Sequence, residues 1–192
     1  GQGSQAPGML APWLELPRFR SSIEVMQEAS GFDLIKHGTQ SDAETIRDTA
    51  VAQPLIVAAG IATAATLFGG KSAADCGITG VSGHSVGEIT AAVAAGIFDE
   101  ATGIKFVNER GQAMAKAAAL EVTSMAAILG GDQAAVEAKL AELGLEPANY
   151  NGGGQIVAAG STEGIAALQA EPVAGTRVIP LQVAGAFHTR YM

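Results

Sequence analysis

Apolar positions in the first third of the chain recur with the period of an α-helix. Phe19, Ile23 and Met26 follow each other at spacings of four and three, so one face of this segment is apolar. Proline is tolerated in the first turn of a helix, and glycine commonly ends one. The pattern therefore predicts an amphipathic helix over residues 17–29, which Gly31 stops.

Two more helices are expected before the middle of the chain. Residues 41–44, with the sequence Ser-Asp-Ala-Glu, match a capping box and predict the start of a short helix. The apolar run from Thr49 to Phe68 predicts a longer helix, with Pro54 near its beginning and Gly69-Gly70 at its end. This run contains Gln53 and is rich in alanine, so we expect a buried helix and not a membrane span.

A serine lies between two glycines at a predicted strand-to-helix turn. The short β-compatible run 78–81 precedes Gly83-His84-Ser85-Val86-Gly87, and the alanine-rich helical run 89–97 follows. This arrangement matches the G-x-S-x-G nucleophile elbow, in which the flanking glycines leave room for a tight turn and the hydroxyl suits attack on a carbonyl. The alternative is that Ser85 only caps the next helix, and the five-residue pattern alone leaves both interpretations open.

An arginine accompanies the apolar stripe of the next helix, which Asp99 caps and which we expect to end near Leu120. Arg110 lies three residues after Val107 and four before Met114, so its guanidinium emerges beside the stripe. A charge in such a place usually has an anion to meet. The alternative is an arginine that extends to solvent or pairs with a nearby carboxylate.

The second half of the chain alternates between strand and helix patterns. Strands are predicted over Ser124–Leu129, Ala148–Asn151, Gln155–Ala159 and Arg177–Val183, and helices over Asp132–Leu143 and Thr162–Ala170. The order β-α-β-β-α-β is that of the ferredoxin-like unit, and Pro180 indicates an edge strand. We therefore expect an α/β fold with a large domain over 1–121, an inserted ferredoxin-like subdomain over 122–183, and a return to the large domain over 184–192.

Composition narrows the class of protein. The 192 residues are 48% hydrophobic and 16% charged, which is typical of a globular chain. The net charge of −8 and the lack of a basic patch argue against nucleic-acid binding. Cys76 is the single cysteine, so an internal disulfide is excluded and a reducing compartment fits.

Three histidines are available as a base for the serine. His37 lies in a short polar connection, and His84 is a neighbour of Ser85 on a tight turn, where adjacent side chains point apart. His188, in a Gly/Ala-rich loop after the inserted subdomain, is the best candidate. The histidines are scattered and Cys76 stands alone, so we expect no metal site.

Five motifs in order carry a family resemblance. They are Gly1-Gln2-Gly3-Ser4-Gln5, Gly83 to Glu88, Glu109-Arg110-Gly111, Asn149-Tyr150-Asn151 followed by Gly154-Gln155 and Ala159-Gly160, and Gly185-Ala186-Phe187-His188. Together they resemble the malonyl-CoA:acyl carrier protein transacylases, and the acyltransferase domains of polyketide and fatty-acid synthases are similar. The resemblance covers nearly the whole chain. It implies an α/β-hydrolase-like large domain with a ferredoxin-like insertion, which agrees with the pattern above.

The resemblance implies roles for residues of the elbow and the histidine loop. Ser85 would be the nucleophile that is acylated, and His188 its base. The backbone N–H groups of Gln2 and Val86 would form the oxyanion hole. Such a site performs ping-pong acyl transfer through an acyl-serine intermediate.

The resemblance also implies the substrates. Arg110 would bind the free carboxylate of the malonyl group through two parallel hydrogen bonds, and Val86 and Phe187 resemble the type that selects malonyl over methylmalonyl. The implied substrates are malonyl-CoA and phosphopantetheinylated acyl carrier protein, in fatty-acid or polyketide biosynthesis, with no bound cofactor. We expect a cytoplasmic monomer that binds neither nucleic acid nor membrane.

Two departures leave alternatives open. Family members begin with a strand before the Gly-Gln-Gly loop and continue well past the late histidine, so we expect that the chain is truncated at both ends. A serine hydrolase or esterase with the same Ser-His pair, or a non-catalytic fragment that retains the fold, remains an alternative function. Because the chain and typical carrier proteins are both acidic, docking would need a local basic patch, with Arg177, Arg190 and Lys116 as candidates.

Overall fold

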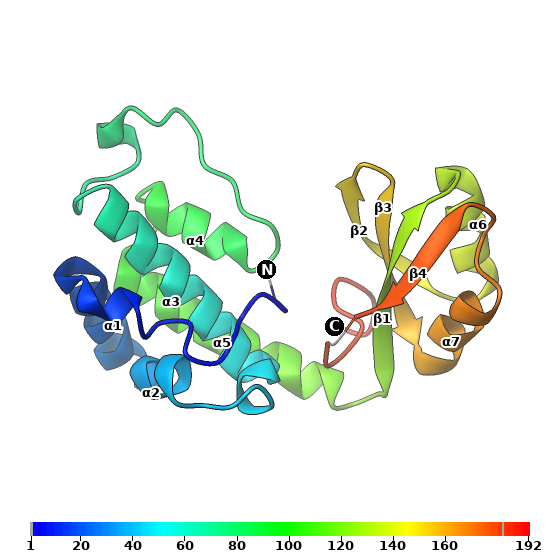
Figure 1. The fold of residues 1–192 in the computed structure, drawn as a ribbon, viewed down its shortest axis with the longest axis horizontal. Helices are drawn as coiled ribbons and strands as arrows, with labels where there is room; N and C mark the ends of the chain where they lie inside the picture. Colours follow the sequence, from blue (N-terminus) through cyan, green and yellow to red (C-terminus); the bar gives the residue numbers. More distant parts are fainter. Residues whose placement is uncertain (1, 182) are drawn as a thin grey trace. The chain divides into compact units, whose positions relative to one another are not determined.

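The computed structural model describes residues 2–181 and 183–192. Its internal contacts divide the chain into two compact units, Gly1–Ala113 and Met114–Met192, and each unit has a hydrophobic core of its own (Figure 1). The expected domain bounds, 1–121, 122–183 and 184–192, stay a prediction.

All the regular elements among the described residues of the first unit are helices. They are η1 (Trp13–Glu15), α1 (Pro17–Ser30), α2 (Leu34–Thr39), η2 (Thr45–Arg47), α3 (Thr49–Leu67), η3 (Ala74–Cys76), α4 (Gly87–Ala94) and α5 (Glu100–Ala118), the last of which continues into the second unit. α3 packs against α1, α2 and α4. The central position of α3 places its side chains in the core of the unit (Figure 1).

Two predicted helices of this unit are confirmed. Phe19, Ile23 and Met26 are buried on α1, which Gly31 ends in the left-handed conformation with φ of 66°. By length and composition alone, α3 is long and apolar enough to cross a membrane, and 44% of an 18-residue stretch of this helix is buried inside the structure. Leu55 is fully buried in the same core as α1, so α3 packs as the core helix of this unit.

Three local predictions in the first unit are wrong. Residues 78–81 form no strand, because the other described residues of this unit include no strand that could pair with them. The predicted capping box precedes only the short 3-10 turn η2, whose N-cap residue is Glu44, and Asp42 Oδ1 accepts a hydrogen bond from the Thr45 N–H at 2.8 Å. His37 lies on α2 and not in a connection, with its Nδ1 3.0 Å from Ser41 Oγ.

The second unit is a four-stranded antiparallel sheet with two helices. Its elements are β1 (Thr123–Gly130), α6 (Gln133–Glu142), β2 (Glu146–Gly152), β3 (Gln155–Ser161), α7 (Thr162–Ala170) and β4 (Thr176–Pro180). The strand order is β2-β3-β1-β4, with every neighbouring pair antiparallel. This confirms the ferredoxin-like unit, and it places Pro180 on an edge strand as predicted.

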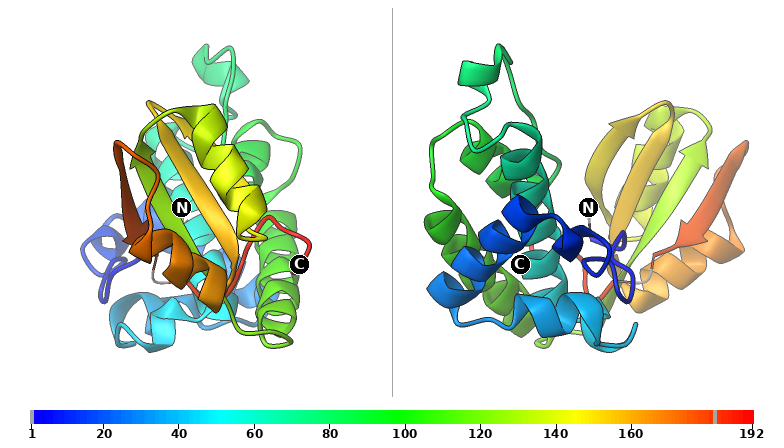
Figure 2. Two further views of the ribbon diagram at one scale, coloured as in Figure 1. Left: turned by 90° about the vertical axis from the view of Figure 1, so that its right-hand side faces the viewer. Right: turned by 60° about the vertical axis from the view of Figure 1, so that its left-hand side comes forward.

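Side chains of the central strands β1 and β3 alternate between two small cores. Ile128 and Ala158 pack with apolar residues of α6 and α7 on one face, where both helices lie (Figure 2). Met125 and Val157 point to the other face, which the last turn of α5 and the residues after β4 cover. The sheet is therefore buried on both faces, and its second core holds the loop that carries the late histidine.

Candidate active site

Ser85 occupies a strained turn directly before α4. Its φ is 53°, in a region of backbone conformation that residues other than glycine seldom adopt. The turn is closed by hydrogen bonds from the Gly87 N–H to the His84 carbonyl and from the Glu88 N–H to the Ser85 carbonyl, both 3.0 Å. Val86 holds the N-cap position of α4, so Ser85 precedes the cap and the alternative of a simple N-cap serine is wrong.

Of the two glycines that flank Ser85, one is required by space. A Cβ on Gly83 would overlap the backbone of Gly87 and Glu88, because the chain passes directly against the first turn of α4. A Cβ on Gly87 would meet nothing within 4 Å. The prediction that both glycines make room for the turn therefore holds for Gly83 and is wrong for Gly87.

Positive φ singles out Ser85 and His188. Among the described residues these are the two non-glycine positions with positive φ, at 53° and 62°. Each such conformation costs on the order of 1 kcal/mol and persists only where the surrounding structure imposes it. Ser85 lies in the first unit and His188 in the second.

The loop that carries His188 is held on the second core. Phe187 is 6% exposed and packs with Met125 and Val157. The Ala186 N–H donates to Thr123 Oγ1 at 2.8 Å, and together these contacts anchor the residues immediately before His188, which is itself exposed. The structure thus places Phe187 as a core residue, and its role in selectivity stays a prediction.

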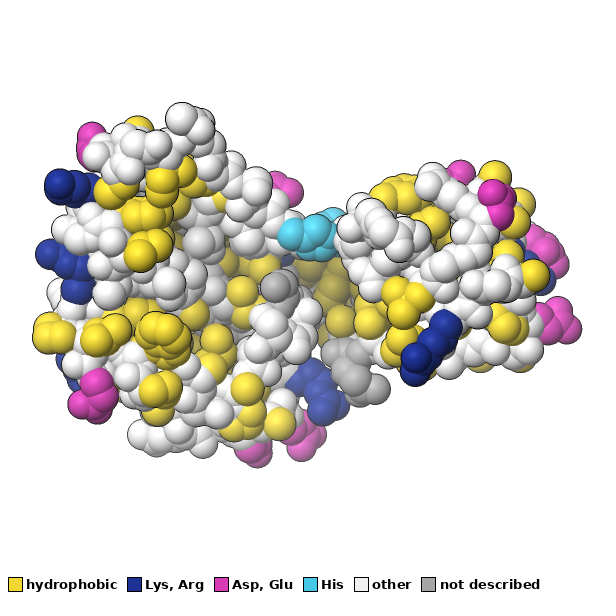
Figure 3. Space-filling view, turned by 45° about the horizontal axis from the view of Figure 1, so that its top comes forward, with side chains coloured by type: hydrophobic (Ala, Val, Ile, Leu, Met, Phe, Trp, Pro, Cys, Tyr) yellow, Lys and Arg dark blue, Asp and Glu magenta, His cyan; other side chains and the backbone are white. Residues whose placement is uncertain are grey.

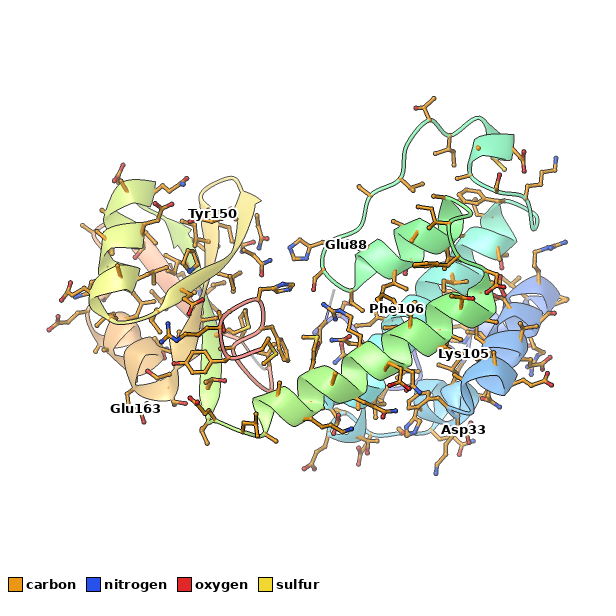
Figure 4. All side chains as sticks on the ribbon, turned by 180° about the vertical axis from the view of Figure 1, so that it is seen from behind. Asp33, Glu88, Lys105, Phe106, Tyr150 and Glu163 are labelled. Carbon is orange, nitrogen blue, oxygen red and sulfur yellow. The ribbon has the colours of Figure 1, made fainter. Side chains whose placement is uncertain are left out.

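Arg110 reaches Ser85 from α5. Its Nη2 donates to Ser85 Oγ at 3.4 Å, and its Nη1 donates to Gln53 Oε1 at 2.6 Å. Burial lowers the pKa of Arg110 from its ordinary value, and the charge of Glu88 raises it; Glu88 projects from the first turn of α4 (Figure 4). An arginine remains protonated under these conditions, so a positive charge lies beside the elbow serine.

The observed partners of Arg110 differ from solvent and a carboxylate, the two alternatives that its sequence position left open. Within residues 2–181 and 183–192, no carboxylate forms an ion pair with this side chain. The guanidinium is half-buried, and its hydrogen-bond partners include an amide oxygen and a hydroxyl. An arginine that extends to solvent, or that pairs with a neighbouring Asp or Glu, is therefore not what the structure contains.

The glutamines at the start of the chain form hydrogen bonds with α3 and with η2. Gln2 Nε2 donates to Thr49 Oγ1 at 3.0 Å, and Gln53 Nε2 donates to Gln2 Oε1 at 3.5 Å. Gln5 Nε2 donates to the Ile46 carbonyl at 3.1 Å. Gln53, 1% exposed, is a site residue that sequence reasoning missed, and its only signal was a polar side chain inside an apolar helix.

Other candidate features lie apart from these residues. His84 is exposed on the turn, and no group of three His, Cys, Asp or Glu among the described residues is placed to hold a metal ion. A pocket of about 260 Å³ in the first unit is lined by Phe68, Val93 and Phe98, among others, and includes none of the predicted site residues.

The candidate basic patch for docking is weaker than its sequence implies. Arg190 Nη1 forms an ion pair with Glu146 Oε1 at 2.6 Å, so part of its charge is already compensated. On the face shown in Figure 3, Lys and Arg side chains are dispersed and do not gather in one patch. Large apolar side chains also remain exposed, including Leu67 and Ile97.

Comparison with known proteins defines the class to which this fold and site belong. Residues 1–192 match the family model described as the acyl transferase domain, and the chain belongs to that family. It is 50% identical over 185 residues to the malonyl CoA-acyl carrier protein transacylase of Mycolicibacterium smegmatis, with 96% of this chain and 63% of that protein covered.

Solved structures agree with this family. The crystal structure of MCAT from Mycobacterium tuberculosis has a TM-score of 0.89 and 46% identity, and the match covers 100% of this chain and 63% of that one. A type II PKS acyl-carrier protein in complex with its malonyl-transacylase has a TM-score of 0.84 and 30% identity, with the same coverage of 100% and 63%. The chain thus spans 63% of the length of these relatives.

Proposed function

We propose that the protein carrying this chain transfers a malonyl group from malonyl-CoA to the phosphopantetheine thiol of an acyl carrier protein, in fatty-acid or polyketide biosynthesis. The observation that carries the proposal is the hydrogen bond from Arg110 Nη2 to Ser85 Oγ at 3.4 Å. It joins the serine of a nucleophile elbow to an arginine that forms no ion pair with any carboxylate in the described part of the chain. Relatives named malonyl CoA-acyl carrier protein transacylase, and a neighbour solved with its acyl carrier protein, support this choice.

The proposed chemistry uses Ser85 and His188 in two mirrored halves. Ser85 Oγ attacks the thioester carbon while its proton passes to His188, and backbone N–H groups of Gln2 and Val86 bind the oxyanion. The C–S bond breaks, coenzyme A leaves with the proton from His188, and the malonyl group stays on Ser85 as an ester. The carrier thiol then gives its proton to His188 and attacks this ester, and Ser85 Oγ leaves and recovers the proton. The acyl group travels on the serine, so this proposal needs no cofactor.

The position of Arg110 favours a transferase that binds the carboxylate of its acyl group, and disfavours a simple serine hydrolase. A planar guanidinium binds a carboxylate through two parallel hydrogen bonds, and the malonyl group carries such a carboxylate next to its reacting thioester. A serine hydrolase of neutral esters gains nothing from a half-buried positive charge beside its nucleophile, which costs desolvation. Phe187, before the histidine, is proposed to contribute to the preference for malonyl.

The test is the covalent intermediate. When the full natural protein is mixed with malonyl-CoA and no carrier protein, mass spectrometry of its peptides should find a malonyl ester on Ser85. Ser85→Ala should abolish the adduct, and His188→Ala should slow its formation by about 10²–10⁴-fold, as expected for loss of a general base. An adduct that persists on another residue in Ser85→Ala, or acylation at an unchanged rate in His188→Ala, contradicts the assigned roles.

A further inference from the structure

A close crossing of α5 over α3 brings Arg110 to Gln53. A Cβ on Gly111 would lie 3.1 Å from the Thr49 carbonyl oxygen and 3.6 Å from Gln53 Cβ, so a larger residue here would push the two helices apart by a few tenths of an ångström. Arg110 is the preceding residue, and its Nη1 donates to Gln53 Oε1 at 2.6 Å. The contact between the two side chains is therefore set by the packing of two helices.

The chemistry of Arg110 fixes the orientation of the Gln53 amide. A guanidinium offers donors only, so Gln53 must present its oxygen to Arg110. Its nitrogen then points away and donates to Gln2 Oε1 at 3.5 Å, and Gln2 Nε2 donates to Thr49 Oγ1 at 3.0 Å. Every hydrogen bond in this row runs in the same direction, from Arg110 to Thr49, and the row holds the Gln53 oxygen toward the guanidinium.

A neutral acceptor at position 53 has a consequence that a carboxylate would not have. A glutamate there would bind the guanidinium as an ion pair and compensate its charge, so an anionic substrate would have to displace it. The amide oxygen of Gln53 orients the guanidinium and leaves its charge available. The acidic group that acts on Arg110 electrostatically is Glu88, whose side chain is exposed and therefore screened by solvent.

Building on the malonyl transfer proposed above, we infer that Gln53 is a positioning residue that sets the selectivity of the site for acyl groups with a free carboxylate. It holds one arm of the Arg110 guanidinium through a neutral oxygen and keeps the positive charge for the substrate. The other arm of the guanidinium, Nη2, donates to Ser85 Oγ.

The experiment compares malonyl-CoA with acetyl-CoA, which lacks the free carboxylate, as acyl donors to the full natural protein. Gln53→Glu should lower kcat/KM for malonyl-CoA by at least about tenfold, mainly through KM, and change the acetyl-CoA value by less than about threefold. Gln53→Met keeps the length of the side chain without its hydrogen bonds and should give a smaller loss, again for malonyl-CoA. Gln112→Glu adds the same charge at an exposed position of α5 and should change neither value.

Arg110→Ala separates failure of this inference from failure of the proposed function. If Arg110→Ala still prefers malonyl-CoA over acetyl-CoA as the natural protein does, the carboxylate clamp itself is wrong. If Arg110→Ala loses the preference while both Gln53 variants keep it, only the role of Gln53 is wrong. Equal losses for the two donors in Gln53→Met, with a lowered melting temperature, would make Gln53 a purely structural residue and overturn the inference.

Discussion

Gly83→Ala is expected to distort the nucleophile elbow through a clash with the first turn of α4. The added methyl group would overlap the Gly87 carbonyl group and the Glu88 nitrogen, which are backbone atoms and have no rotamer to change. The hydrogen bond from the Glu88 N–H to the Ser85 carbonyl, at 3.0 Å, holds this backbone in place. Relief therefore requires that α4 shift or that the turn at Ser85 open.

The size of the effect follows from the kind of atoms involved. Overpacking a well-packed site costs about 1–3 kcal/mol, and rigid backbone neighbours put Gly83→Ala at the upper end, about 3 kcal/mol. We therefore expect a clear fall in Tm and in the urea midpoint of this variant. Acylation of Ser85 should also fall, because the turn that presents its hydroxyl is displaced.

Gly87→Ala is the matched control for this prediction. It adds the same methyl group four residues later, where nothing lies within 4 Å and φ is not positive, so it should leave stability unchanged or raise it by up to about 1 kcal/mol. Thermal and urea unfolding of both variants in the full natural protein measure the difference. Equal melting temperatures for the two variants would refute the steric argument at Gly83.

Two further predictions concern stability away from the elbow. The Asp99 carboxylate accepts hydrogen bonds from the side chain of Thr102 and from its backbone N–H, the latter at 2.6 Å, and these bonds lower the pKa of Asp99 from 3.8. The stabilisation that they give is therefore present above pH 3.8 and is lost as the pH falls through the folded-state pKa. The urea midpoint of the natural protein should therefore fall more between about pH 5 and about pH 3 than that of Asp99→Asn, and parallel slopes would contradict this assignment. Phe187→Ala removes a side chain that is 6% exposed and should cost about 3–5 kcal/mol in unfolding free energy. Phe106→Ala, at a position 52% exposed on α5 (Figure 4), should cost less than about 1 kcal/mol, and similar losses for both variants would show that Phe187 is not a core residue.

Local signals in the sequence were sufficient for much of the fold. The stripe of Phe19, Ile23 and Met26 defined α1, because a period of three to four residues has the same meaning wherever the helix packs. Ser161 directly precedes the predicted helix Thr162–Ala170, and its Oγ caps that helix by accepting a hydrogen bond from the Gly164 N–H at 3.1 Å. In the second unit, strand order follows from the β-α-β-β-α-β sequence of elements, since that order has one common solution.

Predictions that depend on distant partners fared differently. Residues 78–81 have the composition of a strand, but a strand forms only where a second strand satisfies its backbone groups. Gln53 looked like an ordinary polar residue in an apolar helix, because its partner Arg110 is 57 positions away and is brought near by the glycine crossing. Whether Arg110 met solvent, a carboxylate or the elbow serine was likewise decided by helix packing and not by its neighbours in sequence.

The positive φ angles of Ser85 and His188 also have an evolutionary consequence. Glycine at either position would relax the backbone and would add stability on the order of 1 kcal/mol, so a chain judged only by how well it folds would drift toward glycine there. Under the proposed mechanism, Ser85 and His188 give up this stability so that their side chains can take part in the chemistry.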